Sequence, residues 1–494
     1  MEENKQSTTV LAIDFGASSG RAMLGHFDGS TIRMEEIHRF LNEPVIVGET
    51  MYWDILRLYH EIKQSLIKAN RIARVESVAV DTWGVDFGLL DGRGNLIGNP
   101  VHYRDKRTHG MIQKSFERVK EEEFYRITGN QFMECNTVFQ LLSMALSQDE
   151  SLKRAQSLLL MPDLFHYMLC GKKAAEVSIA STTQLLDAKT KQWSRPVLDA
   201  LGIPAAILPE IVPSGTVLGE LQPGLCEELD VAPCKVIAVA GHDTQSAMAA
   251  TPAKEKDFIF LSCGTWSLLG TELESPIVSE ESYRLNVTNE AGFGGTTSFL
   301  KNITGLWLIQ ESRRQWIREG KEFGFQELED LAEQTEPFAC FIDPDAPEFT
   351  PAGNLPRRIQ EYCRKTGQYV PKTEGEIVRC INESLAMKYR SSVEEIKTCT
   401  GKEYRTLYLL GGGVKSPMLC QMTANACAVA VSAGPSEATV LGNIAIQLLT
   451  LGAVKDIKKA RDIIRDSQDI KYYAPERTAK WIEAYQTFKE VTKC

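Results

Sequence analysis

The stretch VLAIDFGASSGRAMLGHFDG, residues 10–29, decides the fold. Its first four residues are apolar and predict a buried strand, residues 14–21 are mostly small or polar, and the apolar pattern resumes at Met23 and Leu24. A strand, a tight turn of small residues and a second strand predict a hairpin whose backbone N–H groups can point at an anion. A plain hairpin turn is the alternative, because short turns of Gly and Ser are common.

The size and charge of the chain limit what this turn can serve. At 494 residues, the chain exceeds the size at which one core stops growing, so we expect two domains. The net charge of −10 argues against nucleic acid as the main partner, and anionic ligands therefore need dedicated local sites. The shares of 43% hydrophobic and 24% charged residues are those of an ordinary globular protein.

The sequence also indicates a compartment. The acidic, polar start MEENKQSTTV does not read as a signal peptide, and no apolar run approaches the length of a membrane span. The cysteines have no CxxC spacing and the histidines form no close pair, so we expect no zinc site. We expect a cytoplasmic protein with reduced, buried cysteines and no functional disulfide. The sequence leaves open whether Cys363 lies near Cys380, or Cys420 near Cys427.

Apolar strand-like runs alternate with helical patterns, which is typical of an α/β fold. The segment SVAVDTWGVDFGLLD, residues 77–91, predicts two strands joined at Thr82 to Gly84. The segment VIAVAG, residues 236–241, predicts a strand that leads at once into a helix. Residues 373–396 predict a long structural helix with a capping box of Thr373 and Glu376 at its start.

The hairpin pattern returns about half a chain length later. The first stretch aligns with FIFLSCGTWSLLGTEL, residues 258–273, so that Asp14 faces Ser262 and Gly16 faces Gly264. Two domains that each open with such a hairpin predict a duplicated fold. We expect one nucleotide to lie in the cleft between the two hairpins.

The residues of the two turns suit a triphosphate held from both sides. Gly16, Gly20 and Gly264 let backbone donors come close to phosphate oxygens. Hydroxyls that can donate to these oxygens belong to three residues: Ser18, Ser19 and Thr265. Arg21 adds positive charge or, alternatively, forms an exposed salt bridge. Because a carboxylate repels phosphate, we expect Asp14 to hold Mg²⁺ through water; the alternative is that it bonds the backbone of its own turn.

A third glycine cluster lies in LYLLGGGVKSPMLCQMTANA, residues 407–426. A buried strand meets Gly411 to Gly413 before a helix begins. Three glycines allow close approach of a planar group, so we expect adenine or the α-phosphate there. Glycine turns between strands and helices are common, so this signal gains weight only from its place after the second hairpin.

The first hairpin, AGHDTQSA, SCGTWSLLG and LLGGGVKS, in this order, resemble the motifs of the FGGY carbohydrate kinases. These kinases belong to the superfamily of hexokinase, actin and the heat-shock chaperone ATPases. Further segments, including VDTWGVDFGLLD, YRDKRT, STTQLLD, LKNITGLWLIQ and GPSEATVLGNIAIQL, resemble the branch of the family that acts on L-rhamnulose. Asp163 and Leu164 follow Met-Pro where kinases such as xylulokinase carry a lysine, which favours the same branch.

The resemblance implies a fold of two duplicated actin/hexokinase-like (ribonuclease H-like) α/β domains, residues 1–253 and 254–494, with a ligand cleft between them. It also implies the site. Asp243 would be the catalytic base and would contact the sugar, and Asp14 would be the carboxylate near Mg²⁺. The further sugar contacts would be Gly84, His242, Thr244 and Asn302. The ATP contacts would be Ala17, Ser18, Ser19, Gly20, Arg21, Thr265, Gln310 and Gly412.

The role of Asp243 agrees with the chemistry of phosphoryl transfer. The transition state is loose and the hydroxyl proton leaves late, so a carboxylate of ordinary pKa, about 4, can accept it. The alternative is that Asp243 caps the helix that follows it. Core packing is the alternative for four neighbouring residues: His242, Trp83, Trp266 and Trp307. We expect Asp105 and Arg107 to form a structural ion pair rather than contact the sugar.

The resemblance therefore implies an ATP- and Mg²⁺-dependent kinase that phosphorylates L-rhamnulose at O1 in the breakdown of L-rhamnose. The product would be L-rhamnulose 1-phosphate. The alternatives are a kinase for another ketose or polyol, and an actin-like or chaperone-like ATPase. We expect a monomer or homodimer without a nucleic-acid or membrane partner.

Overall fold

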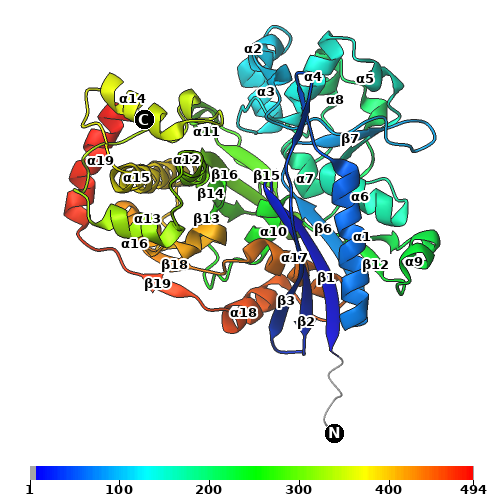
Figure 1. Ribbon diagram of the computed structural model, residues 1–494. Helices are drawn as coiled ribbons and strands as arrows, with labels where there is room; N and C mark the ends of the chain where they lie inside the picture. The colour runs from blue at the N-terminus through cyan, green and yellow to red at the C-terminus, as the bar shows by residue number, and fades with distance from the viewer. Residues whose placement is uncertain (1–6, 493–494) are drawn as a thin grey trace. The chain divides into compact units, whose positions relative to one another are not determined.

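The chain forms two compact units in a computed structural model that describes residues 7–492 (Figure 1). Unit 1 consists of Met1–Pro252, Glu272–Phe299 and Ala438–Ser467. Unit 2 consists of Ala253–Thr271, Leu300–Glu437 and Gln468–Cys494. Each unit has mixed α/β content, as predicted. The division into contiguous halves at residue 253 differs from these units, because two later segments pack with the first half.

A six-stranded sheet of order β11-β12-β6-β1-β2-β3 forms the centre of unit 1. The strands are β1 (Thr8–Phe15), β2 (Ser19–Phe27), β3 (Ile32–Leu41), β6 (Ser77–Thr82), β11 (Thr216–Glu220) and β12 (Lys235–Ala238). β1 is buried along its whole length, which explains its central place. It pairs antiparallel with β2, which confirms the predicted hairpin, and parallel with β6.

Helices cover both faces of this sheet because successive side chains of a strand point to opposite sides. Val78 and Val80 of β6 share a core with the apolar side of α1 (Ile55–Ile72) and with α6 (Met161–Cys170). Ala79, between them, belongs to a second core. The helices that contribute to that second core are α10 (Asp243–Ala249) and α17 (Ala438–Thr450).

The crossing of α10 and α17 depends on a glycine. A Cβ atom at Gly442 of α17 would lie 1.7 Å from the carbonyl oxygen of Ser246 in α10. Only a residue without a side chain lets the two helices come this close. The segment that carries α17 is therefore fixed to unit 1, although it lies late in the sequence.

The remaining elements of unit 1 surround the sheet. The predicted second strand after β6 is present but pairs with β8 in a separate two-stranded sheet. The remaining strands are β4 (Val45–Val47), β5 (Thr50–Tyr52), β7 (Phe87–Leu90), β8 (Ser157–Leu160), β9 (Ala175–Glu176), β10 (Ile211–Val212) and β15 (Thr288–Ala291). The remaining helices are α2 (Met111–Phe116), α3 (Glu121–Thr128), α4 (Thr137–Leu146), α5 (Glu150–Arg154), α7 (Val177–Ser181), α8 (Arg195–Leu201), α9 (Pro223–Leu229), α11 (Glu280–Arg284) and α18 (Ile457–Ser467).

A second sheet has the order β15-β16-β14-β13-β17-β18-β19. Its further strands are β13 (Ile259–Cys263), β14 (Trp266–Leu273), β16 (Thr297–Thr304), β17 (Thr406–Leu410), β18 (Ala430–Ala433) and β19 (Lys471–Tyr473). β13 pairs antiparallel with β14 and parallel with β17, which repeats the pattern of β1, β2 and β6. The predicted duplication of the hairpin is confirmed.

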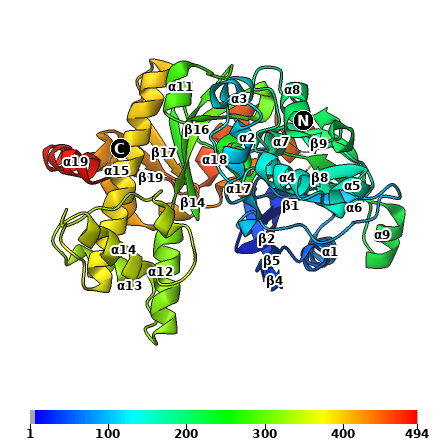
Figure 2. The same ribbon diagram turned by 90° about the horizontal axis from the view of Figure 1, so that it is seen from above.

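The long helix predicted in the second half is α15 (Glu374–Thr400), and its capping box is present. The Thr373 hydroxyl accepts the backbone N–H of Glu376, and the Glu376 carboxylate accepts the backbone N–H of Thr373. Figure 2 shows α12, α13 and α14 gathered toward one end of α15. The other helices of unit 2 are α12 (Trp307–Arg318), α13 (Phe325–Glu333), α14 (Leu355–Lys365), α16 (Pro417–Cys427) and α19 (Thr478–Thr492).

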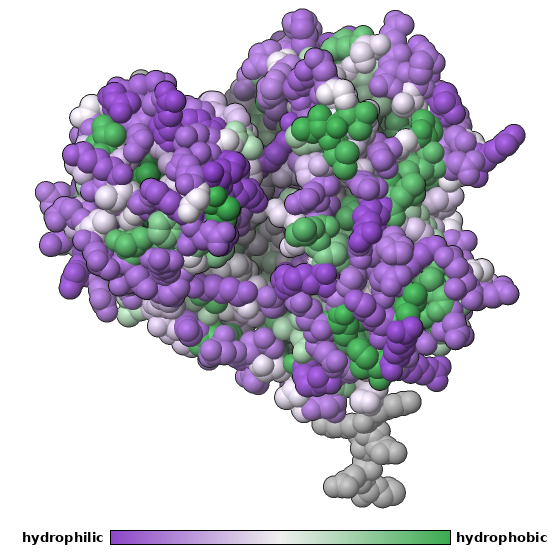
Figure 3. All heavy atoms as spheres, in the orientation of Figure 1, coloured by the Kyte–Doolittle hydropathy of each residue, from purple (hydrophilic) through white to green (hydrophobic). Residues whose placement is uncertain are grey.

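The surface is that of an ordinary globular protein. The face in Figure 3 is mostly hydrophilic and carries separate apolar patches. Between residues 7 and 492, no helix has the length and apolar character needed to cross a membrane.

Candidate active site

Three carboxylates meet at one edge of the sheet in unit 1. Asp14 lies near the end of β1, and Asp81 lies beside it on the parallel strand β6. The next strand, β12, leads into a bridge between Thr82 and His242, after which Asp243 opens α10. The carboxyl ends of parallel strands meet at the same edge of a sheet, where ligands bind in open α/β sheets. The topology therefore brings the two predicted carboxylates, Asp14 and Asp243, to one place.

Asp14 is paired with an arginine of its own hairpin. The Arg21 guanidinium donates to Oδ2 of Asp14 from Nε at 3.0 Å and from Nη2 at 2.7 Å. The turn between them is closed by the N–H of Gly16, which donates to the carbonyl oxygen of Ser19 at 3.0 Å. The observed partner of the Asp14 carboxylate is therefore the Arg21 side chain, and not the backbone of its own turn as in the alternative. Arg21 is only 23% exposed, so its salt bridge is not an exposed one.

Asp81, which the sequence analysis did not select, is fully buried beside Asp14. Its Oδ2 accepts a hydrogen bond from Nδ2 of Asn443 at 2.5 Å. Within residues 7–492, no donor reaches its Oδ1. Burial and then the negative charge of Asp14 raise the pKa of Asp81 well above its usual value. Two neighbouring carboxylates with one free buried oxygen fit a divalent cation, which would relieve their repulsion.

Asp243 is not the cap of its helix, so that alternative is wrong. α10 begins at Asp243, and His242 occupies the N-cap position without a capping hydrogen bond from its side chain. The Asp243 side chain is 32% exposed. Burial among protein atoms raises its pKa to about 6, which the positive charge of His242 opposes and the charge of Asp14 supports. The expected ordinary pKa near 4 is therefore too low, and Asp243 is a stronger base.

A chain of buried polar groups holds His242. Its Nδ1 lies 2.8 Å from Oε2 of Glu290, and the same oxygen accepts a hydrogen bond from Nε2 of Gln245 at 2.8 Å. Ser298 donates in turn to Oε1 of Gln245 at 2.6 Å. The Nε2 atom of His242 faces Oδ1 of Asp243 at 3.5 Å. His242 is buried, but it belongs to a polar chain rather than an apolar core.

Glu290 sets the charge of this histidine. Burial alone would lower the pKa of His242, but the negative charge and hydrogen bond of Glu290 outweigh it and raise this pKa to about 9. The imidazole is therefore a cation near neutral pH. A fixed positive charge beside Asp243 favours the carboxylate form of that residue.

A second buried glutamate fixes the turn before Asp243. Glu176 accepts the backbone N–H of Gly241 at 2.9 Å and the N–H of Ser178 at 3.0 Å. A Cβ atom at Gly241 would lie 3.2 Å from Oε2 of Glu176, so the close approach favours glycine. The N–H of His242 donates to Oγ of Ser178 at 3.3 Å. The turn is thus held from α7, independently of the helix it begins.

Gly84, a predicted sugar contact, follows β6 at the same edge. A Cβ atom there would lie 3.2 Å from the Thr182 side chain, whose hydroxyl accepts the N–H of Val85 at 3.1 Å. Trp83 is buried, as the core alternative predicts, and its Nε1 donates to Asp86 at 3.0 Å. The other two tryptophans of that prediction are only half-buried: Trp266 and Trp307.

The predicted ion pair between Asp105 and Arg107 is wrong. Asp105 accepts the backbone N–H of Arg107 at 2.9 Å and that of Met51 at 2.8 Å. The guanidinium of Arg107 donates instead to the side-chain oxygen of Gln140 at 2.6 Å. Asp105 caps a short 3₁₀ turn. Both residues therefore have structural partners, as expected, but they do not pair with each other.

Three of the predicted ATP contacts lie together in unit 2. The Thr265 hydroxyl donates to Oε1 of Gln310 at 3.3 Å. A Cβ atom at Gly412 would lie 3.7 Å from the carbonyl oxygen of Cys263, directly before the second turn. Asn302, a predicted sugar contact, lies on β16 and is half-buried. The predicted ATP contacts of unit 2 thus come from the turn after β13, the glycine cluster after β17 and the first part of α12.

Sequence reasoning missed three buried acids: Asp81, Glu176 and Glu290. A signal existed for Asp81, since SVAVDTWG carries an aspartate directly after four residues of a strand-like run, just as VLAIDFG does. Glu290 had none, because its partner His242 is 48 positions away. Glu176 also bonds Ser178 nearby, but its contact with Gly241, which ties it to the site, spans 65 positions.

Comparisons with known proteins agree over nearly the whole chain. Residues 9–250 match the N-terminal domain of the FGGY family of carbohydrate kinases, and residues 259–451 match its C-terminal domain. A rhamnulokinase of Bacteroides thetaiotaomicron is 42% identical over 484 residues, which cover 98% of this chain and 99% of the relative. A rhamnulokinase of Enterococcus faecalis is 41% identical over 476 residues, 96% of this chain and 95% of the relative.

The fold is similar to that of solved sugar kinases. The ligand-bound xylulose kinase from Lactobacillus acidophilus has a TM-score of 0.80, with 98% of this chain and 97% of that chain covered. At 16% sequence identity, this likeness shows the fold alone.

Proposed function

Since the chain belongs to the FGGY family of carbohydrate kinases, we propose that it transfers the γ-phosphoryl group of ATP to O1 of L-rhamnulose. The products are L-rhamnulose 1-phosphate and ADP. The observation that carries the choice of sugar is the 42% identity to a rhamnulokinase over 98% of this chain. The environment of Asp243 supports the chemistry.

Asp243 accepts the proton of the O1 hydroxyl in this proposal. Its pKa of about 6 leaves it mostly ionised at neutral pH, with a higher affinity for the proton than an ordinary aspartate. The proton leaves late in a loose transition state, so the base assists without forming an alkoxide first. His242 lies 3.5 Å away, stays protonated, and keeps Asp243 charged until the proton arrives.

Asp14 and Asp81 are the residues of unit 1 that fit Mg²⁺. The free buried oxygen of Asp81 supports this assignment. The bound ion would neutralise charge on the phosphate oxygens of ATP. Arg21, paired with Asp14 at 2.7 Å, supplies a second positive charge at the same edge of the sheet.

The phosphate contacts are the backbone and hydroxyl donors of the first hairpin, residues 17–21. A Cβ atom at Gly20 would lie 2.3 Å from the Phe40 ring, so packing against Phe40 requires glycine at this position of the turn. In unit 2, we assign ATP contacts to Thr265, Gln310 and Gly412. The sugar contacts are assigned to five residues: Gly84, His242, Asp243, Thr244 and Asn302.

We propose a cytoplasmic enzyme that works as a monomer or homodimer. The described cysteines carry free thiols, which supports a reducing compartment.

A panel of ketoses with Mg-ATP tests the function. We expect the highest kcat/KM for L-rhamnulose, with the phosphate on O1 by NMR. Loss of the sugar's methyl group should lower kcat/KM by only about 10- to 200-fold, because a methyl contributes little to discrimination. A much higher kcat/KM for glycerol, D-xylulose or L-ribulose would overturn the choice of L-rhamnulose as substrate. The assignment as a carbohydrate kinase would remain. ATP hydrolysis that no ketose or polyol changes would support the actin-like ATPase instead.

A further inference from the structure

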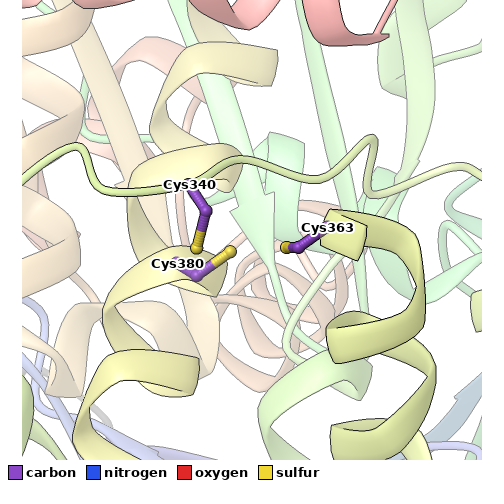
Figure 4. Close-up of side chains that lie close together, drawn as sticks. All are labelled: Cys340, Cys363 and Cys380. Atoms are coloured by element: carbon purple, nitrogen blue, oxygen red, sulfur yellow. The ribbon is translucent and has the colours of Figure 1, made fainter. Parts of the chain in front are cut away.

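Three buried cysteines of unit 2 come together from separate elements (Figure 4). Cys363 lies on α14, Cys380 on α15, and Cys340 on the segment between α13 and α14. Their sulfur atoms all lie within 4.8 Å of one another, and none of the three residues is more than 3% exposed. The sequence left the approach of Cys363 and Cys380 open, but it gave no signal for the third thiol.

We propose that Cys340, Cys363 and Cys380 bind one thiophilic metal ion with a filled d shell, of the class of Zn²⁺ and Cu⁺. Metal–sulfur bonds of about 2.3 Å place the sulfurs of such a site ~4 Å apart. The observed spacing needs only small side-chain movements to reach this value. Three thiolates form a complete trigonal site for Cu⁺, or three of the four ligands of Zn²⁺.

A cavity of about 360 Å³ is lined in part by two of the three cysteine residues. Its wall includes Cys340 and Cys380 together with the polar side chains of Tyr369, Arg379 and Glu383. A cavity of this volume beside two of the three cysteines leaves room for a water as the fourth ligand of Zn²⁺.

The cavity wall carries one cationic residue, Arg379, and three acidic residues: Glu336, Glu376 and Glu383. The proposal therefore rests on the approach of the three sulfurs, and these neighbours contribute by fixing the backbone around the thiols. Arg379 donates from Nε to Glu383 at 2.8 Å, which fixes its position. Glu383 also accepts the N–H of Phe338 at 2.8 Å, two residues before Cys340. Partners around the ligands, rather than the ligands alone, hold the geometry of metal sites.

Hydrogen bonds also anchor the segment that carries Cys340. The N–H of Phe341 donates to the side chain of Gln368 at 2.8 Å, directly beyond α14. The N–H of Ile342 donates to the Ser384 hydroxyl of α15 at 3.0 Å. The third thiol is therefore held between the two helices that carry the others. An ion there would join three elements of unit 2 and should stabilise this unit.

Metal analysis of the full chain tests the site. Protein purified under reducing conditions without a chelator should retain about one equivalent of zinc or copper per chain. Metal-free protein should take up one equivalent of Co²⁺ with a thiolate charge-transfer band. Added Zn²⁺ should raise the melting temperature of the wild type. Cys340→Ser should lose all three responses, whereas Cys234→Ser, at a buried cysteine outside the cluster, should keep them.

The two ions and the alternative outcomes are separable. Zn²⁺ and Cu⁺ are distinguished by elemental analysis and by competition with a Cu⁺-specific chelator. In case Cys340→Ser does not fold, alkylation of unfolded-state-accessible thiols in metal-loaded and metal-free wild type gives the same answer: all three thiols should react more slowly in the metal-loaded protein. Reduced wild-type protein that binds neither ion overturns the proposal. So does a disulfide between Cys363 and Cys380 under reducing conditions, or full metal binding by a folded Cys340→Ser.

Discussion

The two hairpins share a topology and differ in charge. In unit 1, β1 pairs with β2 and β6, and Asp14 lies beside Asp81. In unit 2, β13 pairs with β14 and β17 in the same way, and Ser262 lies beside Leu410. The position that holds two carboxylates in one unit thus holds a hydroxyl and an apolar side chain in the other.

This difference indicates that the two copies of the duplicated fold have different roles. The backbone turn is kept in both units, so both retain N–H donors that suit phosphate. The carboxylates, which suit a metal ion and a proton, are kept in unit 1 alone at this position. Asp243 and its partners lie in the same unit. We infer that unit 1 performs the chemistry and that the hairpin of unit 2 contributes binding.

The largest expected effect comes from Asp243→Asn. The amide keeps the size of the side chain but cannot accept the proton, so kcat should fall by about 10² to 10⁴. The fold should survive, because the Asp243 side chain is not a helix cap. Steady-state kinetics and calorimetric titration with an ATP analogue measure the two properties. A folded variant with unchanged kcat would show that Asp243 is not the catalytic base. The inferred difference between the two units would then be wrong as well.

The contrast is tested directly by Asp81→Asn, with Ser262→Ala in the hairpin of unit 2 as the control. Loss of a carboxylate from the proposed Mg²⁺ site should lower kcat/KM by about 10- to 100-fold and raise the Mg²⁺ concentration needed for half-maximal rate. The control should change either value by less than about twofold, as expected for a minor substitution.

Stability separates this effect from misfolding. The raised pKa of Asp81 means that its contribution to stability is present at low pH and is lost as the pH rises through its folded value. The amide introduced by Asp81→Asn carries no charge, so the variant should melt no lower than the wild type at pH 8. Equal kinetic losses in Asp81→Asn and Ser262→Ala would contradict the division of work.

The sequence predicts the hairpins well because their signals are local. A buried strand, a turn of small residues and a second strand lie within about twenty residues, and the repeat of the pattern predicts the duplicated fold. The long helix α15 is predicted for the same reason, since its cap and its apolar spacing are adjacent in sequence. The resemblance to a known family adds the residues expected at the site, and these stay predictions.

The environment of these residues is not predictable in this way. Glu290 reaches His242 across 48 positions, and Asn443 reaches Asp81 across 362. The pKa of Asp243 depends on such neighbours, so the ordinary value expected for it is too low. The error in pairing Asp105 with Arg107 has the same cause, because the competing acceptor, Gln140, is 33 positions away.

A smaller loss of activity is expected from Glu290→Gln, which should act by changing the charge of His242. The variant removes the charge that raises the pKa of His242 to about 9. The activity at pH 8 should fall about tenfold, equivalent to one charged hydrogen bond of about 1.5 kcal/mol. The alkaline limb of the kcat/KM profile should also move to lower pH.

The pH dependence of the free energy of unfolding tests the same interaction. The raised pKa of His242 makes its contribution complete below its unfolded value of about 6.5, and that contribution is lost as the pH rises through about 9. The wild type should therefore lose stability across this window, and Glu290→Gln should lose less. Ser298→Ala, two hydrogen bonds beyond Glu290 in the same chain, should shift the profile less. An unchanged pH profile in a folded Glu290→Gln would assign Glu290 a purely structural role.

The smallest effect is expected in the hairpin of unit 2. Thr265→Val keeps the branched shape of the side chain and removes the hydroxyl that donates to Gln310 at 3.3 Å. If this hydroxyl contacts ATP, one neutral hydrogen bond of about 1 kcal/mol is lost, and the KM for ATP should rise about 3- to 10-fold. The kcat should stay within about twofold, because a contact made equally in the ground and transition states affects binding alone. Kinetics at saturating sugar, with Ser18→Ala in the first hairpin measured alongside, give both constants. A large fall in kcat for Thr265→Val at unchanged KM would place part of the chemistry in unit 2 and end the contrast from which it was derived.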